Sequence, residues 1–323
     1  MSENDSEKNN YCFLLLNTYI IKNKKAMVKN MTRLFVIGNG FDIKHGLNTS
    51  FQNFKNEVEK NDLKLFEIIN EAEKKYNEHN PHNTSNEWSD FEEILRFINF
   101  AKYNINYIDD PIKLLSQINN SNIENNNNKI VDEITKQFSK WVSKIKLEIN
   151  GKSKKISNEN YYLSFNYTSV LQEKYNINRE NINQIHLRKS LSRPYIFGMR
   201  KLEEDNSFSS KFKRGLDEIV NDASKIFEKP VNDIINEGLV NYKNIKEIYF
   251  WGFSLSDVDK PYIKKIFIDN KDTIEKVFLC KHQFDPKDRE CSESNDKKRY
   301  YNFLKEHNFE DKLEKFNDEL NDK

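Results

Sequence analysis

Hydrophobic positions along the chain change their spacing several times, and each change predicts a different element. Thr32–Ile37 is a short apolar run of β-branched and aromatic residues, which is typical of a buried strand. From about 50 to 150 the apolar residues recur at helical spacing, with helices expected at 88–98 and 130–149 and a loop at 121–128. Strand patterns then return at Tyr161–Phe165, Asn183–His186, Tyr195–Phe197, Ile245–Trp251 and Thr273–Leu279.

This order of elements predicts the fold class. Helical patterns at 211–243 and 261–268 separate the later strands, and alternation of strands with helices is typical of a parallel sheet. We therefore expect an α/β fold, a Rossmann-like and mostly parallel sheet with a large helical insertion after the first strand, at about 54–150. The expected organisation is an N-terminal extension outside the core at 1–30, an α/β domain at 31–290 and a C-terminal helical tail at 291–323.

Composition and charge narrow the function classes. The chain has 52 Lys and Arg against 51 Asp and Glu, and a dedicated nucleic-acid binder usually carries a basic excess. Nucleic acid is therefore not an expected partner. The three cysteines, Cys12, Cys280 and Cys291, lack the close spacing of a zinc site, which favours a reducing compartment and a cytoplasmic protein without a bound metal.

One apolar run near the start of the chain bears on membrane association. Tyr11–Ile21 is shorter than the roughly 20 residues that a membrane-spanning helix needs. A helix on the membrane surface and a small packing arm stay open as interpretations of this run, but we expect no membrane partner.

The helix at 88–98 is expected to be capped by Ser89 or Asn86.

The first of four polar turns is Gly38-Asn-Gly-Phe-Asp42, directly after the first strand. Glycines there permit a tight turn and let a phosphate approach backbone amides, but Ile43 occupies the place of the third glycine of the dinucleotide fingerprint. Asp42 and His45 are three residues apart and share one helix face, which suits a contact to ribose or, less well, to a metal. An ordinary turn and a structural histidine are the alternatives.

The second and third turns follow later strands. Asn166, in Ser164-Phe-Asn-Tyr-Thr168, has a donor and an acceptor with which to orient a water or a ribose hydroxyl. His186, in Gln184-Ile-His-Leu-Arg188, has an ordinary pKa near 6.5, which suits a general base at neutral pH. A turn residue and a structural histidine are the alternatives here. The basic residues that follow would hold phosphates or form a solvated face: Arg188, Lys189, Arg193 and Arg200.

The fourth turn lies in Phe250–Asp259, where a strand ends at a glycine followed by hydroxyl and acidic residues. Ser254 and Ser256 are candidates for bonds to ribose or phosphate, and Asp257 or Asp259 for a helix cap. Ligands of parallel sheets bind beyond the carboxyl ends of the strands. Because all four turns fall at such ends, we expect one shared site.

Leu34–Phe54, with Gly-Asn-Gly-Phe-Asp-x-x-His-Gly-Leu-x-Thr-Ser-Phe, closely resembles the opening motif of the AbiH family of bacteriophage abortive-infection proteins. Trp88–Leu95, Ser164–Thr168 and Trp251–Asp257 also look like AbiH segments, so the resemblance covers about 31–280. It implies bacterial defence against phage through arrest or death of the infected cell. Because unchecked activity would kill the host, we expect control by homo-oligomerisation or by a phage-derived trigger.

The order of glycine turn, Phe-Asn-Tyr, Ile-His and Gly-x-Ser-Leu is more distantly similar to sirtuin-like NAD-consuming domains. That resemblance implies NAD as the substrate, with Asn166 and His186 as catalytic residues. Leu187 stands where a glycine usually follows the histidine, which would narrow the site or change the role of His186. The paired zinc cysteines of deacetylase sirtuins are missing from the sequence, which favours hydrolysis over deacetylation. The cofactor-binding residues expected are Gly38, Asn39, Gly40, Phe41, Asp42, His45, Gly252, Ser254 and Asp257.

The expected reaction is hydrolysis of NAD at the nicotinamide–ribose bond, through an oxocarbenium-like transition state. Asn166 would position the ribose or the attacking water, and His186 would accept a proton. Trp88 and Asp90 of the helical segment would reach in, with an anchor in the core as the alternative for Trp88. Two alternatives stay open. One is a non-catalytic nucleotide-binding sensor or partner-binding module; the other is a metal-dependent nuclease using Asp42, His45, His186 and Asp257.

Overall fold

The computed structural model describes residues 32–79, 88–98, 120–186, 231–236, 238, 240–284 and 295–321. Six strands of this part form one sheet in the order β3-β2-β1-β4-β5-β6, and every neighbouring pair is parallel. The prediction of an α/β fold with a parallel sheet is confirmed. The strands are β1 (Arg33–Ile37), β2 (Tyr161–Ser164), β3 (Ile182–Gln184), β4 (Glu247–Trp251), β5 (Lys276–Cys280) and β6 (Leu313–Phe316).

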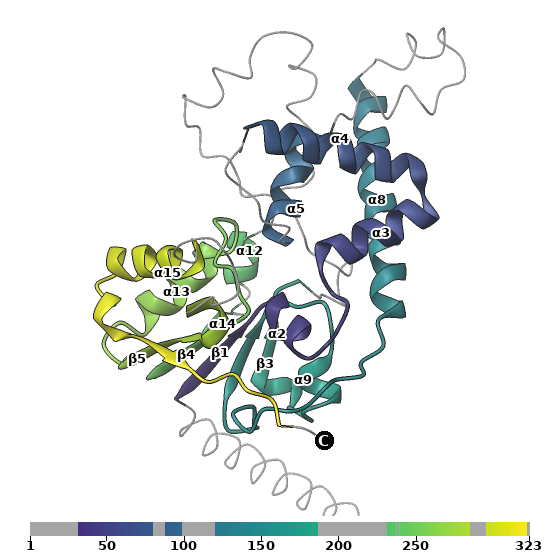
Figure 1. Ribbon diagram of the computed structural model, residues 1–323. Helices are drawn as coiled ribbons and strands as arrows, with labels where there is room; N and C mark the ends of the chain where they lie inside the picture. Colours follow the sequence, from purple (N-terminus) through teal and green to yellow (C-terminus); the bar gives the residue numbers. More distant parts are fainter. Residues whose placement is uncertain are drawn as a thin grey trace, which may run out of the picture.

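Helices cover both faces of this sheet (Figure 1). The helices of the sheet region are α2 (Asn39–Lys44), α9 (Val170–Glu173), α12 (Val231–Asn236), α13 (Lys260–Asp269), α14 (Lys281–Phe284) and α15 (Asn295–Glu306). Short 3-10 turns, η2 (Arg179–Asn181) and η5 (Glu310–Lys312), precede β3 and β6. Residues of α12, α13 and α15 share one hydrophobic cluster with the sheet, and residues of α2 and α9 share another.

The central strand β1 explains this layering. Successive side chains of a strand point to opposite faces, and four of its five residues are buried. Leu34 and Val36 belong to the cluster of α13 and α15, whereas Phe35 and Ile37 belong to the cluster of α2 and α9. A strand buried on both faces has the continuous apolar sequence by which β1 was predicted.

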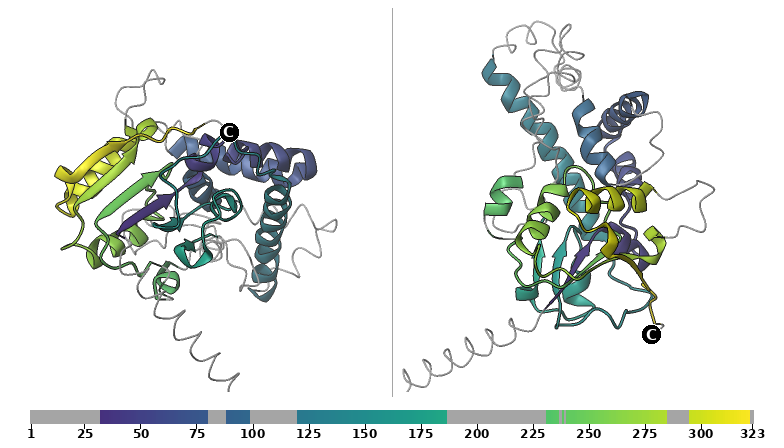
Figure 2. Two further views of the ribbon diagram at one scale, coloured as in Figure 1. Left: turned by 90° about the horizontal axis from the view of Figure 1, so that it is seen from below. Right: turned by 90° about the vertical axis from the view of Figure 1, so that its left-hand side faces the viewer.

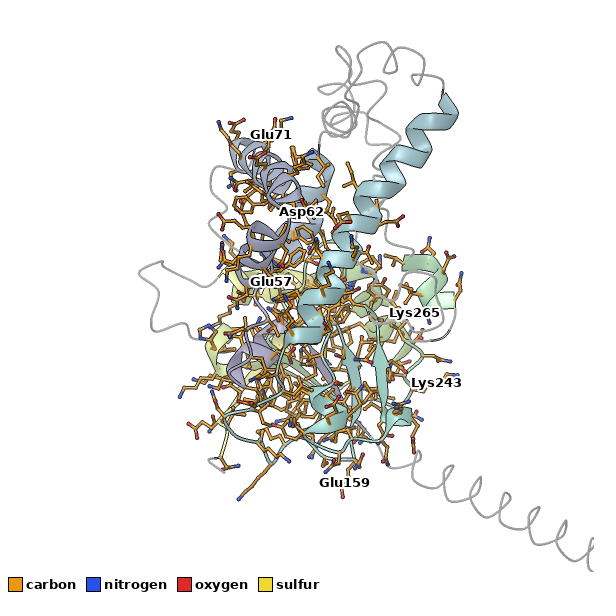
Figure 3. All side chains as sticks on the ribbon, turned by 90° about the vertical axis from the view of Figure 1, so that its right-hand side faces the viewer. Glu57, Asp62, Glu71, Glu159, Lys243 and Lys265 are labelled. Carbon is orange, nitrogen blue, oxygen red and sulfur yellow. The ribbon has the colours of Figure 1, made fainter. Side chains whose placement is uncertain are left out.

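Between β1 and β2 lies a helical region, made of α3 (Phe51–Asn61), α4 (Leu63–His79), α5 (Trp88–Ile94), η1 (Leu95–Phe97) and α8 (Asn120–Lys144). These helices bury their own hydrophobic cluster, and Lys144 of α8 pairs with Glu57 of α3. They group beside the end of the sheet where α2 follows β1 (Figures 1 and 2). Figure 3 labels Glu57, Asp62 and Glu71 on this group, at the opposite end of the molecule from Glu159.

Two expectations for these helices were wrong. The asparagine-rich segment 121–128 is helical, as the first part of α8, rather than a loop. Asn disfavours helix only weakly, and a helix held by the buried residues Ile130, Ile134 and Phe138 can extend through such a segment. Ser89 is not a cap, because α5 already begins at Trp88; the other candidate, Asn86, lies outside the described residues.

The region after 290 was expected to be a helical tail, and the structure corrects this. After α15 the chain adds β6 in parallel to β5, and Tyr300 and Phe303 of α15 are buried in the main core. Beyond β6, Asn321 pairs with Lys152 in an isolated bridge. The sequence pattern missed β6 because Leu313-Glu-Lys-Phe316 carries charges at its two middle positions, both exposed at the sheet edge.

Several expectations fall outside the described residues: the extension at 1–30, the strand at Tyr195–Phe197, most of the helix at 211–243 and the basic residues from Arg188 to Arg200. Across the part of the chain that the structure does describe, no helix combines the length and apolar character that crossing a bilayer requires.

Candidate functional site

The turns after β1 and β4 pack directly against each other through three glycines. A Cβ atom added to Gly38 would lie 2.4 Å from the carbonyl oxygen of Gly252, and one added to Gly40 would lie 2.6 Å from the Cα of Gly252. Gly252 itself has a φ of +62°, and its Cβ would lie 2.3 Å from the backbone nitrogen of Phe41. Glycine is therefore required here because two backbones touch.

Hydrogen bonds between these turns occupy the backbone amides of the β1 turn. The amide of Gly38 donates to the carbonyl of Trp251 (3.0 Å), and that of Gly40 donates to the carbonyl of Gly252 (2.9 Å). The amide of Phe41 donates to the carbonyl of Gly38 (2.9 Å). The three amides that the sequence suggested for a phosphate thus already have protein acceptors, while Asn39, between the two glycines, is partly exposed.

His45, at the end of α2, is fully buried among aromatic rings. Its Nδ1 lies 2.7 Å from the carbonyl oxygen of Phe41, and its Nε2 lies 2.6 Å from the hydroxyl of Tyr175. Since a carbonyl only accepts, Nδ1 carries the proton and Nε2 accepts from Tyr175, whose oxygen accepts in turn from the amide of Ser153 (2.8 Å). Burial lowers the pKa of His45. Both ring nitrogens are engaged within the protein, as the structural alternative anticipated.

Asp42, one turn before His45, is only 1% exposed. Its Oδ2 accepts a hydrogen bond from the hydroxyl of Thr168 (2.6 Å), in the turn after β2. Burial raises the pKa of the Asp42 carboxyl from 3.8 to about 7, against the opposing effects of Thr168 and Asn166. The group therefore exchanges its proton near neutral pH.

Asn166 lies beside this carboxyl and is 4% exposed. Its amide nitrogen in the backbone donates to the Ser164 hydroxyl (3.3 Å). The Oδ1 of Asn166 and the Oδ1 of Asp42 are both buried without a hydrogen-bonding partner. A buried polar atom left unsatisfied costs about 1–3 kcal/mol, so these two oxygens are the candidate acceptors for hydrogen bonds from a ligand.

Aromatic residues lie between the turn after β2 and the end of β3. His186, just after β3, is buried between the rings of Tyr167 (centroids 5.0 Å apart) and Phe165 (5.7 Å). Tyr167 also packs on Phe138 of α8 at 4.6 Å. Burial raises the pKa of the Tyr167 hydroxyl well above 10, with further contributions from the carboxylates of Glu92 and Asp259. The helical region thus reaches the ends of β2 and β3.

The loop after β4 separates two acids that are close in sequence. Asp257 points outward with its side chain 66% exposed and pairs with Lys260 (2.6 Å). Asp259 is buried and occupies the N-cap position of α13, but its carboxylate accepts from the Ser256 hydroxyl (3.2 Å) instead of capping the helix. The sequence therefore correctly placed Asp259, one of its two candidates, at the N-cap position of α13, but the expected hydrogen bond from its side chain to the helix is not formed. Ser254 is partly exposed.

Thr168 and Glu92 are two residues of this region to which the sequence analysis gave no role in the site. Thr168 was part of the second motif, and its β-branched hydroxyl at a strand end was the available signal. Glu92 lies in the helix expected at 88–98 and is buried, and the burial of this acid could not be seen from the spacing of the apolar residues around it. We call Asp42, Asn166, Tyr167, Thr168 and His186 the strand-end cluster.

The structure brings together Asp42 and Asn166, with His186 reached through the ring of Tyr167, whereas His45 and Asp257 face elsewhere. Within the described residues, no group of three or more His, Cys, Asp or Glu side chains is placed to hold a metal ion.

Comparison with known proteins gives one match. The family model described as Bacteriophage abortive infection AbiH matches residues 34–279. No curated protein and no solved structure gives a match. The matched range begins in β1, ends in β5 and contains every residue of the strand-end cluster. The chain belongs to the AbiH family of bacteriophage abortive-infection proteins.

Proposed function

We propose that this protein acts in abortive infection by hydrolysing NAD at the nicotinamide–ribose bond, at the strand-end cluster. The observation that carries the proposal is the pair of buried acceptor atoms without a partner, Oδ1 of Asp42 and Oδ1 of Asn166. The neighbouring hydroxyls of a ribose can donate to two adjacent acceptors at once. Occupancy by a nucleotide would remove the cost of leaving both atoms unsatisfied.

The sheet supports a nucleotide as the ligand. A strand order of 3-2-1-4-5-6 is that of Rossmann-like dinucleotide-binding domains, which bind at the carboxyl ends of the strands where the order reverses. Here the reversal falls between β1 and β4, and Asp42 follows β1. In this proposal the helices between β1 and β2 are an insertion in a Rossmann-like domain, and they cover the bound nucleotide.

The chemistry assigns one task to each polar group. Asn166 holds the ribose and directs a water molecule to its C1′ carbon. The C1′–nitrogen bond breaks, nicotinamide leaves with the bonding electrons, and the water oxygen bonds to C1′ while His186 takes the water proton. Positive charge develops on the ribose, and an ionised Asp42 carboxylate in buried surroundings would stabilise it. The products are nicotinamide and ADP-ribose.

The remaining candidates receive different roles. Asn39 and Ser254 are partly exposed and stay proposed contacts to the nucleotide. Gly38, Gly40, Phe41 and Gly252 shape the turn that carries Asp42, because their contacts are with one another. His45 and Asp257 are given no contact with the nucleotide, since their polar atoms are directed to Tyr175 and Lys260.

The test is release of free nicotinamide from NAD by purified protein, with and without lysate of phage-infected cells as the source of a trigger. Removal of a general base costs typically 10²–10⁴-fold, so His186→Ala and Asn166→Ala should each reduce release at least about 100-fold. Asp257→Asn is the matched control, because this exposed acid near the β4 turn should be dispensable. Release by both alanine variants at the wild-type rate would contradict the assignment.

A nucleotide-binding sensor is the second candidate, and Leu187 after the proposed base favours it. In that case no condition yields nicotinamide, while NAD or a related nucleotide still raises the melting temperature and Asn166→Ala removes that shift. A metal-dependent nuclease using Asp42, His45, His186 and Asp257 is not supported, because two of these four side chains are directed away from the cluster.

A further inference from the structure

Gln283, in the short helix α14, is buried and uses its full hydrogen-bonding capacity. Its Oε1 accepts from the backbone amide of Gly252 (3.0 Å) and from the thiol of Cys280 (3.1 Å). Its Nε2 donates to the carbonyl of Phe253 (2.8 Å) and to a carboxylate oxygen of Asp296 (3.2 Å). A glutamine amide offers two acceptor sites and two donors, and all four are satisfied here.

The orientation of this amide is fixed by its partners. The Gly252 amide only donates and the Phe253 carbonyl only accepts, so exchanging the nitrogen and oxygen of Gln283 would break both bonds. Burial raises the pKa of the Cys280 thiol to about 11, which keeps its proton available for Oε1. One side chain thereby clamps two consecutive residues of the β4 turn.

The same turn is held from α15. Arg299 donates to the carbonyl of Ser254 (2.6 Å), and the Tyr300 hydroxyl donates to the carbonyl of Phe253 (2.5 Å). The turn includes a strained residue, the buried Leu255 at a φ of +52°, a conformation that branched side chains rarely adopt and that surrounding contacts must enforce. The contacts from α14 and α15 are suited to that task.

The turn after β4 contacts the turn after β1, which carries Asp42. Gly252 touches Gly40 and Phe41 and accepts the amide of Gly40, which lies two residues before Asp42. We propose that Gln283 is a positioning residue of the functional site, which through Gly252 keeps the β1 turn closed and Asp42 shielded from water. Gln283 of α14 and Arg299 and Tyr300 of α15 lie beyond the 34–279 that the family model matches, and they are thus part of the support of the site. The consequence for catalysis rests on the proposed NAD hydrolysis, whereas the shielding of Asp42 does not.

The first readout is the titration of the Asp42 carboxyl, followed by carbon-13 NMR with Asp42→Asn for assignment. In Gln283→Leu, which keeps the size of the side chain without its hydrogen bonds, water should enter the turn and the pKa should fall from about 7 toward 3.8. Gln283→Glu keeps an acceptor for the Gly252 amide but sets a carboxyl against the Phe253 carbonyl and Asp296, so it should also lower the pKa of Asp42. Gln137→Leu is the matched control, a buried glutamine of α8 that bonds Glu133 and should leave the titration unchanged.

The second readout is nicotinamide release, which should fall at least about tenfold in kcat for Gln283→Leu and remain at the wild-type value for Gln137→Leu. A folded Gln283→Leu whose Asp42 titrates as in the wild type would overturn the proposal. If Gln283→Leu does not fold, Gln283→Glu decides, and an unshifted titration there overturns it equally. If the wild type releases no nicotinamide, the proposed function fails while the titration still decides the role of Gln283.

Discussion

The two halves of the strand-end region differ in how completely their polar atoms are used. On the β1–β4 side, the turn amides, the glycine contacts and His45 are satisfied within the protein. On the side facing β2, Asp42 and Asn166 each present a buried oxygen without a partner. The glycine turn of the most distinctive sequence motif therefore serves mainly to hold the two turns together, and the unpartnered oxygens of Asp42 and Asn166 are the atoms proposed to bind the ligand.

The difference teaches how to interpret glycine-rich turns. A glycine pair after a strand suggests a phosphate site, yet here Gly38 and Gly40 accommodate a second backbone, that of Gly252. The physical requirement, space for a close approach, is the same in both cases. What distinguishes them is whether the amides of the turn are already paired.

The largest effect is expected from disrupting the close contact between the turns after β1 and β4. Gly252→Ala places a Cβ 2.3 Å from the Phe41 nitrogen and also requires alanine at positive φ. Gly238→Ala is the matched control, because Gly238 has a φ of +78° but no heavy atom within 4 Å of the added Cβ. The control should lose about 1–2 kcal/mol of unfolding free energy in urea, and Gly252→Ala more than about 4 kcal/mol. Equal losses would mean that the glycine contact contributes nothing beyond the φ requirement.

The next effect concerns Asp42, whose contribution to the free energy of unfolding depends on pH. The pKa of Asp42 is about 7 in the folded chain against 3.8 as the ordinary value, so the folded state holds this proton longer. Its stabilising contribution is complete below pH 4 and is lost as the pH rises through 7. Asn cannot ionise, so Asp42→Asn should become more stable than the wild type with rising pH, by up to about 4 kcal/mol at pH 8.

Denaturant unfolding at pH 4, 6 and 8 measures this difference. Asp257→Asn, which alters an exposed acid, should show no such trend. A difference between Asp42→Asn and the wild type that stays constant over this range would show that Asp42 is ionised throughout.

A smaller effect tests whether His45 has a structural role, with both ring nitrogens bonded within the protein. Tyr175→Phe removes the donor to the His45 Nε2 and the acceptor of the Ser153 amide. Two buried groups lose a partner, so the melting temperature should fall in line with a loss of about 1–3 kcal/mol. Tyr301→Phe, at a half-exposed position of α15, should have little effect. Loss of nicotinamide release without loss of stability would instead place His45 in the chemistry.

The sequence was sufficient for the inner sheet and insufficient for its edge. The strands β1, β2, β4 and β5 were expected within a few residues of their bounds, because buried parallel strands are continuously apolar. An edge strand needs no such pattern, and β6 exposes Glu314 and Lys315. Its place is set by pairing with β5, which no local pattern encodes.

For the site, strand-end position predicted which turns meet but not which way each side chain faces. Asp257 and Asp259 lie in one turn, yet one is exposed and the other buried. The backbone of the same turn is held at Phe253 and Ser254 by α14 and α15, which come later in the chain. Contacts of this kind join residues such as Gly252 and Gln283 whose sequence neighbourhoods give no hint of each other.

The central place of β1 has a consequence for folding. Its two partners begin only at Tyr161 and Glu247, so about half of the 323-residue chain must be made before the first edge of β1 is paired, and a further 87 residues, from the end of β2 at Ser164 to the end of β4 at Trp251, before the second. Pairings between distant segments fold slowly and leave unpaired edges open to aggregation. Arg33 at one end and the Gly-Asn-Gly turn at the other flank this strand as residues that discourage intermolecular β-pairing. A newly made chain is thus expected to depend on chaperones until β2 and β4 have emerged.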